Sequence, residues 1–362
     1  MILTFCGDIS IIQSNRKLWD YGSVQSLFGK VADLFHASDR VIINLECALT
    51  EKDTAIRKYG PNLKGPARAA ALLKEAGVTD CGLSNNHIYD FSKPGLDDTL
   101  DALDKAGLNY IGVGCNEEDS RRDLIIQQDG KTIRVITVCE HEYSYAMSDF
   151  PGARPYDPYD TAEDIRNAKS QADYVVVMYH GGKEHCRYPS PRLRKLCQAM
   201  ITEGADLVLC QHSHCIGCVE EFNDGTIVYG QGNFHFLYPE MAKGDAWNEG
   251  LAVQVDLSEK AKVSLIPVVV TKTGIDLASK EKTDEILSGI ELRNADLLNG
   301  KWQEHWHNFC VSMEEQYKNA VAGFYNGGEL DIELFAHYLD CEAHTDVWRE
   351  LYPTFHKAKI SQ

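Results

Sequence analysis

The stretch YVVVMYHGG, residues 174–182, reads as a buried strand that ends at His180 and a pair of glycines. Unbroken apolar runs of this kind are typical of strands inside α/β proteins. The carboxyl ends of such strands lie along one edge of the sheet, where ligands bind. We expect four other polar groups, each placed after an apolar run, to meet His180 there: Gly7-Asp8, Asn44-Leu45-Glu46, Asn85-Asn86-His87 and His212-Ser213-His214.

Apolar runs alternate with helix-like stretches through the first two-thirds of the chain, which predicts βαβ units with mostly parallel strands. The middle differs, because residues 124–128 and 132–138 predict a hairpin around Asp129-Gly130, and residues 140–159 predict a long surface loop. The other expected strands are 2–6, 41–43, 79–83, 109–113, 174–178 and 207–210, and the expected helices are 24–35, 67–76, 94–106, 161–170 and 190–202.

The second half is richer in strands. Residues 219–222, 226–229, 251–257 and 262–270 predict a run of antiparallel strands. A strand-rich half after a βα-rich half favours two sheets packed as a sandwich with helices outside. Beyond Thr273 the strand pattern stops, and three or four helices are expected, with a break at Gly327-Gly328. We therefore predict an α/β domain over residues 1–272 and a helical extension over residues 273–362.

The composition is that of an ordinary globular protein and argues against two classes of partner. The 362 residues are 44% hydrophobic and 25% charged. A formal net charge of −18 disfavours a nucleic-acid surface, although bound cations would still admit an anionic substrate. The sequence shows no signal-peptide pattern and no apolar run of roughly 20 residues. We therefore expect a cytoplasmic protein without membrane insertion, whose 12 cysteines are mostly buried free thiols.

Two of the polar groups offer carboxylates at strand ends. Asp8 follows Gly7, which permits close backbone approach, and suits a hard or borderline cation; an aspartate that caps the next turn is the alternative. Glu46 follows three β-branched residues, so its burial would be costly without a partner. A shared metal ion is the strongest partner available, although a salt-bridged surface turn would explain Glu46 alone equally well.

The group Asn85-Asn86-His87 offers both a ligand and a catalytic side chain. An amide oxygen is a weak metal ligand that can exchange for a substrate oxygen. His87 would then face the substrate as a general acid or an electrostatic stabiliser. Asp90 could bind the second ring nitrogen of His87 and fix its tautomer. Asparagine-rich turns without such a role are also frequent.

Imidazoles supply the remaining ligands. A core histidine is the ordinary interpretation of His180, but the two glycines after it favour tight backbone beside a ligand. His212 and His214 lie two apart on an extended segment, so both point the same way and can serve one metal or two neighbouring metals. The five groups together predict a metal site far more specifically than any one of them.

The order of these motifs, followed by Gly230-Gln231-Gly232-Asn233-Phe234, resembles the CapA or poly-γ-glutamate capsule synthesis family of the calcineurin-like metallophosphoesterase superfamily. The resemblance covers about residues 1–270. It implies an α/β fold in the form of a four-layer α/β/β/α sandwich, and metal-assisted hydrolysis by two divalent ions. It places Asp8 and His214 at the first metal, Asn86, His180 and His212 at the second, Glu46 between them, and His87 as the catalytic histidine.

One position departs from the superfamily pattern, because Ser10 stands where many members carry a histidine. The first metal would therefore be short of one protein ligand. Mixed nitrogen and oxygen ligation suits zinc, manganese or iron. We further expect Asn44 and Asn85 to support the ligands from behind, and Asn44 and Asn233 to contact the substrate.

Loop residues near the predicted site could hold an anionic substrate. We predict Lys64, in the loop after Glu46, as one contact; its neighbours Lys58 and Arg68 could act likewise or be solvated. Glu184 and His185, which follow the glycines after His180, are predicted to line the rim, with Arg187 beside them.

Two further patterns have ordinary explanations. Cys215-Ile216-Gly217-Cys218 has no second pair of the same spacing, so a zinc or iron–sulfur centre is disfavoured. The segment Trp302–His307 has the spacing of helix packing with solvent-facing imidazoles.

Two hypotheses remain open. The leading one is a metal-dependent hydrolase that acts on an anionic polymer, its precursor or a phosphoester of capsule or polysaccharide assembly. The alternative is an accessory protein that uses a metal-bearing or degenerate fold as a scaffold in a capsule-assembly complex, because fold does not establish activity. The C-terminal helices could cover the sandwich, form a homo-oligomer contact or bind a biosynthetic partner.

Overall fold

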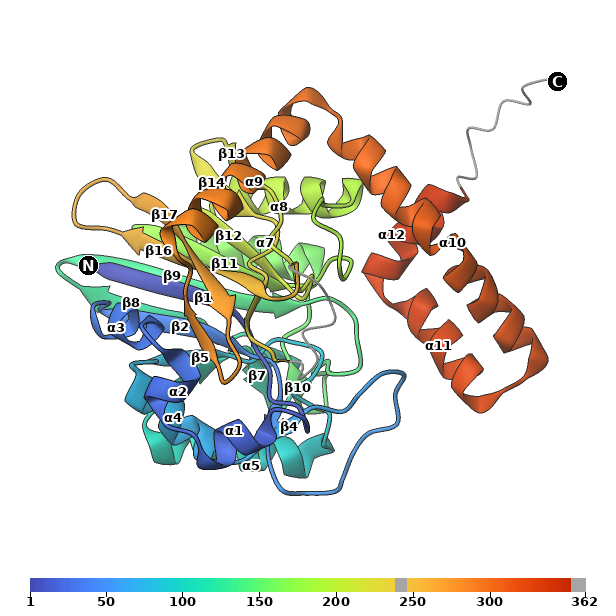
Figure 1. Ribbon diagram of the computed structural model, residues 1–362, viewed down its shortest axis with the longest axis horizontal. Helices are drawn as coiled ribbons and strands as arrows, with labels where there is room; N and C mark the ends of the chain where they lie inside the picture. Colours follow the sequence, from blue (N-terminus) through green and yellow to red (C-terminus); the bar gives the residue numbers. More distant parts are fainter. Residues whose placement is uncertain (238–245, 353–362) are drawn as a thin grey trace.

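The computed structural model describes residues 1–237 and 246–352. Two β-sheets lie face to face between layers of helices, and further helices follow at the C-terminal side of the chain (Figure 1). The arrangement confirms the predicted four-layer α/β/β/α sandwich with a helical extension.

The larger sheet is built around β1, with the strand order β18-β17-β16-β1-β2-β5-β6. β1 pairs in parallel with β2 and antiparallel with β16, and its carboxyl end also pairs with β15. The strands are β1 (Ile2–Ile9), β2 (Arg40–Leu45), β5 (Asp80–Gly82), β6 (Asn109–Ile111), β15 (Asn233–His235), β16 (Glu249–Asp256), β17 (Lys262–Val270) and β18 (Ile275–Leu277).

The smaller sheet has the order β13-β14-β12-β11-β9-β8. Its central strands β9, β11, β12 and β14 are parallel, whereas β8 and β9 form the predicted hairpin. The strands are β8 (Leu124–Gln128), β9 (Lys131–Cys139), β11 (Tyr174–His180), β12 (Leu207–Gln211), β13 (Val219–Phe222) and β14 (Gly225–Val228).

Successive side chains of β11 point to opposite faces of the smaller sheet, so the strand contributes to two hydrophobic cores. Val176 and Met178 point between the sheets, where they join Phe5 and other residues of the larger sheet. Val175 and Val177 point the other way, into the core under α7 (Pro158–Lys169) and α8 (Pro191–Glu203). Because both faces are covered, the strand is apolar throughout.

Five helices cover the outer face of the larger sheet. The expected helix over residues 24–35 is wrong in one respect, because it is two helices. Gly29 has a φ of 47° and ends the first of them, a conformation that glycine adopts without strain. The five are α1 (Arg16–Tyr21), α2 (Val24–Phe28), α3 (Val31–His36), α4 (Arg68–Ala76) and α5 (Ser92–Ala106).

Short elements and edge strands differ from the expectations. The expected antiparallel run is divided between the sheets, since β13 and β14 belong to the smaller and β16 and β17 to the larger. β18 lies beyond Thr273, where three residues are too few to show an alternating pattern. The predicted loop over 140–159 contains the short strand β10 (Gly152–Ala153) and the start of α7. The remaining short elements are β3 (Ala48–Leu49), β4 (Lys64–Gly65), β7 (Val113–Gly114), α6 (Glu117–Ser120) and β10 (Gly152–Ala153).

The C-terminal helices are α9 (Lys280–Asn299), α10 (Trp302–Asn326), α11 (Glu329–Asp340) and α12 (Glu342–Leu351). α9 packs on the sandwich, where Ile286 and Ile290 enter the core between the sheets. α10, α11 and α12 pack on one another (Figure 1), and Gly327 makes the predicted break between α10 and α11. The domain boundary at residues 272 and 273 stays a prediction.

Polar contacts attach α12 to the N-terminal end of α8 and to the segment that follows β9. Asp346 accepts hydrogen bonds from Ser190 Oγ at 2.5 Å and from Arg192 Nε at 2.9 Å. Glu342 accepts one from the backbone N–H of His141 at 2.9 Å. The α10–α12 bundle is therefore held beside the strand ends. Over the described ranges, every helix is too short or too polar to cross a bilayer.

Candidate metal centre

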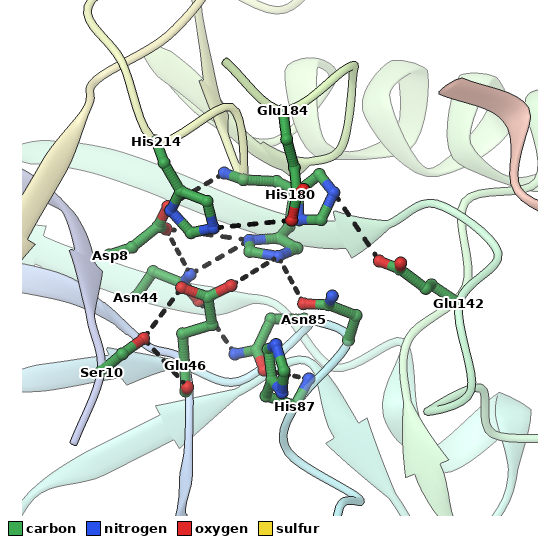
Figure 2. Close-up of polar contacts among 12 residues, drawn as sticks. Asp8, Ser10, Asn44, Glu46, Asn85, His87, Glu142, His180, Glu184 and His214 are labelled. Carbon is green, nitrogen blue, oxygen red and sulfur yellow. Dashed lines mark hydrogen bonds and ion pairs between the residues drawn. The ribbon is translucent and has the colours of Figure 1, made fainter. Parts of the chain in front are cut away.

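Strand ends from both sheets bring three buried ligands together. Asp8 lies near the end of β1, Glu46 follows β2, and His180 is the last residue of β11. Each offers a ligand atom within 4.8 Å of the others, and all three side chains are buried. Figure 2 shows His180 in the middle of the cluster, with Asp8 on one side and Glu46 below it.

Glu46 also belongs to a second ligand group. Its carboxylate lies with His212 and His214 in a set whose ligand atoms are within 4.8 Å of one another. Glu46 Oε1 and His212 Nδ1 are buried and have no hydrogen-bond partner among residues 1–237 and 246–352. Unpaired buried polar atoms are costly. The residues therefore fit a divalent cation, and Glu46 belongs to both ligand groups. The groups join Asp8 with His180 and His212 with His214, whereas the resemblance places Asp8 with His214 and His180 with His212.

Asparagine side chains hold the ligands in place. Asn44 Nδ2 donates to Asp8 Oδ1 at 2.8 Å and lies 3.1 Å from His180 Nδ1. Asn85 Nδ2 donates to Asn44 Oδ1 at 3.1 Å, behind that pair. Asn86 Oδ1 lies 3.0 Å from His180 Nε2, which places its amide oxygen inside the ligand cluster.

Ser10 and Asn233 each orient one ligand. Ser10 Oγ donates to Glu46 Oε2 at 3.0 Å, so the residue at the position where the resemblance expects a histidine fixes the shared carboxylate. Asn233 Nδ2 donates to the Trp247 carbonyl at 3.0 Å, so its Oδ1 accepts from His214 Nδ1 at 2.9 Å. That tautomer leaves His214 Nε2 available as a ligand atom. Asn233, predicted as a substrate contact, thus lies against a ligand.

The two histidines after β12 have unusual backbone conformations. His212 and His214 have φ values of 79° and 53°, in the left-handed region that side chains rarely adopt. The backbone N–H of His212 donates to Asp8 Oδ2 at 3.0 Å. That bond ties the strained loop to the larger sheet. Strain of this kind clusters at functional sites.

Burial disfavours charge on the side chains of the metal-free cluster. It raises the pKa of Asp8 to about 7, with a further increase from the neighbouring Glu46, and it raises the pKa of Glu46 to about 7. It lowers the pKa of His180 to about 4 and that of His212 to about 3. The imidazoles are therefore in the neutral form that binds metals. Each carboxyl is about half protonated at pH 7, and a cation must displace those protons.

Metal affinity should consequently fall as the solution becomes acidic. Below pH 7 the carboxyls of Asp8 and Glu46 are protonated in the metal-free fold, so each proton displaced on binding weakens the affinity by about tenfold per pH unit. Calorimetric titration with zinc or manganese at pH 6, 7 and 8 measures this slope. Equal affinities across that range would contradict the assignment of these carboxyls as ligands.

A second group of charged residues lies beside the ligands. His87 Nδ1 donates to Asp90 Oδ2 at 2.6 Å, the contact predicted from their spacing, and Lys58 pairs with Asp90 Oδ1. Burial opposes ionisation of Asp90, but the charges of His87 and Lys58 bring its pKa below the usual value. An ionised Asp90 fixes the tautomer of His87 with the proton on Nδ1, which leaves Nε2 as the ring nitrogen without a proton.

A cavity of about 460 Å³ opens next to His87, a size typical of small-molecule sites. The sandwich and the C-terminal helices both line it. Glu184 and His185 lie on its wall as predicted. The sandwich also contributes Lys58 and His87, and α11 and α12 contribute His337, Tyr338 and His344.

The structure does not bring Lys64 into this group. Its Nζ donates to Asp53 Oδ1 at 2.9 Å and to the Lys52 carbonyl at 2.8 Å. Arg68 is likewise engaged elsewhere, by the carbonyls of Trp19 and Gly22. Of the three cations named in the prediction, Lys58 is the one that reaches the site, where its Nζ lies 3.1 Å from His87 Nδ1.

Sequence reasoning missed several residues of the cavity. Glu142 Oε2 lies 3.7 Å from His212 Nε2, and Glu142 Oε1 lies 3.3 Å from His337 Nε2. A signal for Glu142 existed, because Glu140-His141-Glu142 follows a strand as the five polar groups do. His337 gave no such signal, since it lies in an ordinary helical pattern far along the chain.

The cysteines and the C-terminal aromatic pattern behave as predicted. All 12 cysteines are free, and every one except Cys115 is buried. Cys215 and Cys218 are among the buried thiols, and Trp302 and Trp306 are buried in helix packing.

Comparison with known proteins identifies the family. The family model described as bacterial capsule synthesis protein PGA_cap matches residues 2–238. The chain belongs to this family. Its membership confirms the resemblance seen in the motifs, and the PGA_cap match contains every predicted ligand. The helices α9–α12 lie outside the matched residues.

The chain is similar in sequence to two proteins whose names refer to polymer synthesis. It is 32% identical over 237 residues to the PGA biosynthesis protein CapA of Bacillus subtilis (strain 168), a match that covers 64% of this chain and 62% of that protein. It is 25% identical over 293 residues, 75% of this chain and 76% of the relative, to a Mycobacterium tuberculosis protein named "Probable polyglutamine synthesis accessory protein". The chain thus spans less than two-thirds of the length of the Bacillus relative.

Solved structures of similar shape include a 5'-nucleotidase from Candida albicans SC5314. It is 10% identical, and the match covers 74% of this PGA_cap chain and 52% of the nucleotidase, with a TM-score of 0.44. A hypothetical protein from Thermus thermophilus gives a TM-score of 0.47 at 16% identity, over 74% of this chain and 98% of that one. These scores are too low to transfer a function.

Proposed function

We propose that this chain is a metal-dependent hydrolase that acts on an anionic polymer, its precursor or a phosphoester in capsule or polysaccharide assembly. The observation that carries the proposal is the buried Glu46 carboxylate, which two ligand groups share beside a cavity that also contains His87. Two cations, of manganese, zinc or iron, would be held by Asp8, Glu46, Asn86, His180, His212 and His214.

The metal ligands and the His87–Asp90 pair would have different roles in the reaction. Bound divalent cations would polarise a substrate oxygen and make water a better nucleophile. His87, held by Asp90, presents Nε2 toward the cavity, where it exchanges a proton with the leaving group or stabilises charge on the substrate. Lys58 keeps Asp90 ionised, so it acts on His87 through that carboxylate.

Activity after metal removal and reloading tests the proposal. We expect the protein loaded with manganese or zinc to hydrolyse at least one class among phosphodiesters, phosphomonoesters and γ-glutamyl peptides, and the stripped protein to be inactive. His180→Ala should lower kcat by at least about 100-fold, because it removes a ligand from the centre of the cluster. His36→Ala, at an exposed histidine, is the matched control. Equal activity in His180→Ala and in His36→Ala would refute the proposal.

An accessory role is the second candidate, and a surface feature favours it. The α10–α11 turn exposes Tyr325 and Leu330, at 91% and 71% of their full accessible area, a surface suited to a partner in a biosynthetic complex. The relative from Mycobacterium tuberculosis is named as an accessory protein. If the chain binds metal fully but hydrolyses none of the three substrate classes, the accessory role is favoured.

A further inference from the structure

The carboxylate of Glu184 lies beside the metal ligands but has no role in the chemistry proposed above. Its Oε1 is 4.0 Å from His214 Nε2, and its side chain is 42% exposed. Figure 2 shows Glu184 entering the cluster from above, toward His214, whereas Glu46 enters it from below. Glu46, His212 and His214 form a group of three ligands. Divalent cations in proteins take four or more ligands, so this group needs at least one more.

Hydrogen bonds show which nitrogen of each histidine is free for a cation. His214 Nδ1 donates to Asn233 Oδ1 at 2.9 Å, which leaves Nε2, the atom that Glu184 faces. His212 Nδ1 is buried and has no hydrogen-bond partner in the part of the chain that the structure describes, whereas its Nε2 lies 3.7 Å from Glu142. Glu184 therefore approaches a ligand nitrogen, and Glu142 approaches a nitrogen on the far side of its ring.

The distance between Glu184 and His214 fits two ligands of one ion. Two atoms that each lie about 2.1 Å from a zinc ion are about 3.4 Å apart in a tetrahedral site and at most about 4.2 Å apart in any site. The observed 4.0 Å is inside that limit. Glu184 is outside the group whose ligand atoms all lie within 4.8 Å of one another, so its carboxylate must move inward by roughly 1–2 Å to join it. Rotation of a partly exposed glutamate side chain supplies such a movement.

Backbone hydrogen bonds hold the turn that carries Glu184 against the segment that carries both histidines. The N–H of His185 donates at 2.8 Å to the carbonyl of Ser213, the residue between the two histidines. The N–H of Gly182 donates to Glu140 Oε2 at 2.8 Å, and Gly182 has a φ of 94°, which glycine adopts without strain. The backbone on both sides of Glu184 is thus held, so only its side chain has to move when a cation binds.

We propose that Glu184 is a fourth protein ligand of the divalent cation that Glu46, His212 and His214 hold. The inference rests on the proposed function in one respect, because it needs a cation in this cluster, but it does not need hydrolysis. Two carboxylates would balance the charge of a divalent ion, and the mixture of oxygen and nitrogen ligands suits zinc or manganese. As a ligand, Glu184 would bind the cation rather than the substrate.

Metal titration of substituted proteins tests this assignment. Glu184→Gln should weaken binding of one zinc or manganese ion by about 10- to 100-fold, because an amide oxygen is a weak ligand, and should leave the other ion bound as in the wild type. Glu184→His is also uncharged at pH 8 but offers an imidazole, so it should bind zinc more tightly than Glu184→Gln. Glu259→Gln, at an exposed glutamate between β16 and β17, is the matched control and should bind both ions as the wild type does.

Spectroscopy separates a ligand from a nearby charge. In protein loaded with cobalt(II), Glu184→Gln should change the visible absorption, because its energy and intensity depend on the atoms bound to the ion. A charge that acts only through space would weaken binding equally in both uncharged variants and leave the absorption unchanged, and that result would overturn the inference. So would a rise in KM without a change in metal affinity, the result expected of a substrate contact.

Failure of this inference and failure of the proposed function give different results. Metal binding that depends on Glu184 without any hydrolysis would support the ligand and contradict the hydrolase. Hydrolysis with equal metal affinity in Glu184→Gln and Glu259→Gln would do the reverse, and a wild-type protein that binds no divalent cation would refute both. Because a tighter ligand stabilises the fold more, zinc should raise the melting temperature of Glu184→Gln less than that of the wild type, while the metal-free proteins melt alike.

Discussion

Glu46→Gln is expected to abolish stoichiometric metal binding at both positions, which is the largest single effect that the structure predicts. Glu46 is the residue shared by both ligand groups, and its Oε1 lacks a hydrogen-bond partner among the described residues. An amide keeps the shape of the side chain and the contact with Ser10 but removes the charge. Affinity for zinc or manganese should fall by at least about 100-fold, and hydrolysis should be lost with it.

The same substitution should leave the metal-free fold intact. Burial raises the pKa of Glu46 to about 7, above its unfolded value, so this carboxyl stabilises the fold while protonated and that stability is lost as the pH rises through about 7. The amide of Glu46→Gln does not titrate. Metal-free wild-type protein should therefore lose melting temperature relative to the variant as the pH rises from about 4.5 to about 7, and lose no more above that pH.

Metal content after gel filtration, calorimetric affinity and melting curves measure these effects together. Glu163→Gln, at an exposed glutamate of α7, is the matched control and should bind metal as the wild type does. If Glu46→Gln retains both metals, the shared position of Glu46 is refuted. If it fails to fold without metal, the assigned cause of its raised pKa is refuted.

The strand ends of the site could be predicted because local pattern and topology agree there. The run before His180 is apolar on both faces, so it had to be a central strand, and parallel strands place their carboxyl ends on one edge. The same reasoning brought Asp8 and Glu46 to that edge, where the structure has them. The contact between His87 and Asp90 could be predicted because the two residues are three apart, and a single turn of the chain brings residues at that spacing together.

Positions that depend on loop paths and distant helices could not be predicted in this way. Lys58 and Lys64 lie in the same loop after Glu46, and nothing in the sequence distinguishes them as substrate contacts. The path of that loop brings Lys58 to Asp90, whereas Lys64 binds Asp53. His337 approaches Glu142 across almost two hundred residues of chain, through packing that no local pattern encodes. Gly29 divides a helix whose apolar spacing alone predicts one continuous element.

His87→Gln is expected to lower kcat by about 10²- to 10⁴-fold while metal content stays unchanged. His87 lines the cavity and is held through Nδ1 by Asp90, and it is absent from both ligand groups found among the described residues. Glutamine can keep a hydrogen bond to Asp90, but it cannot exchange a proton near neutral pH. The loss should therefore appear in kcat rather than in metal affinity.

The contrast with a ligand substitution makes this result decisive. His180→Ala should lose metal and activity together, whereas His87→Gln should lose activity alone, and His307→Gln, at a half-exposed histidine of α10, should lose neither. Substrates with an activated leaving group such as p-nitrophenolate need less proton transfer, so His87→Gln should be impaired less with them. If His87→Gln instead loses metal, or retains full kcat on a substrate with a poor leaving group, His87 does not act on the substrate and its bond to Asp90 serves the loop alone.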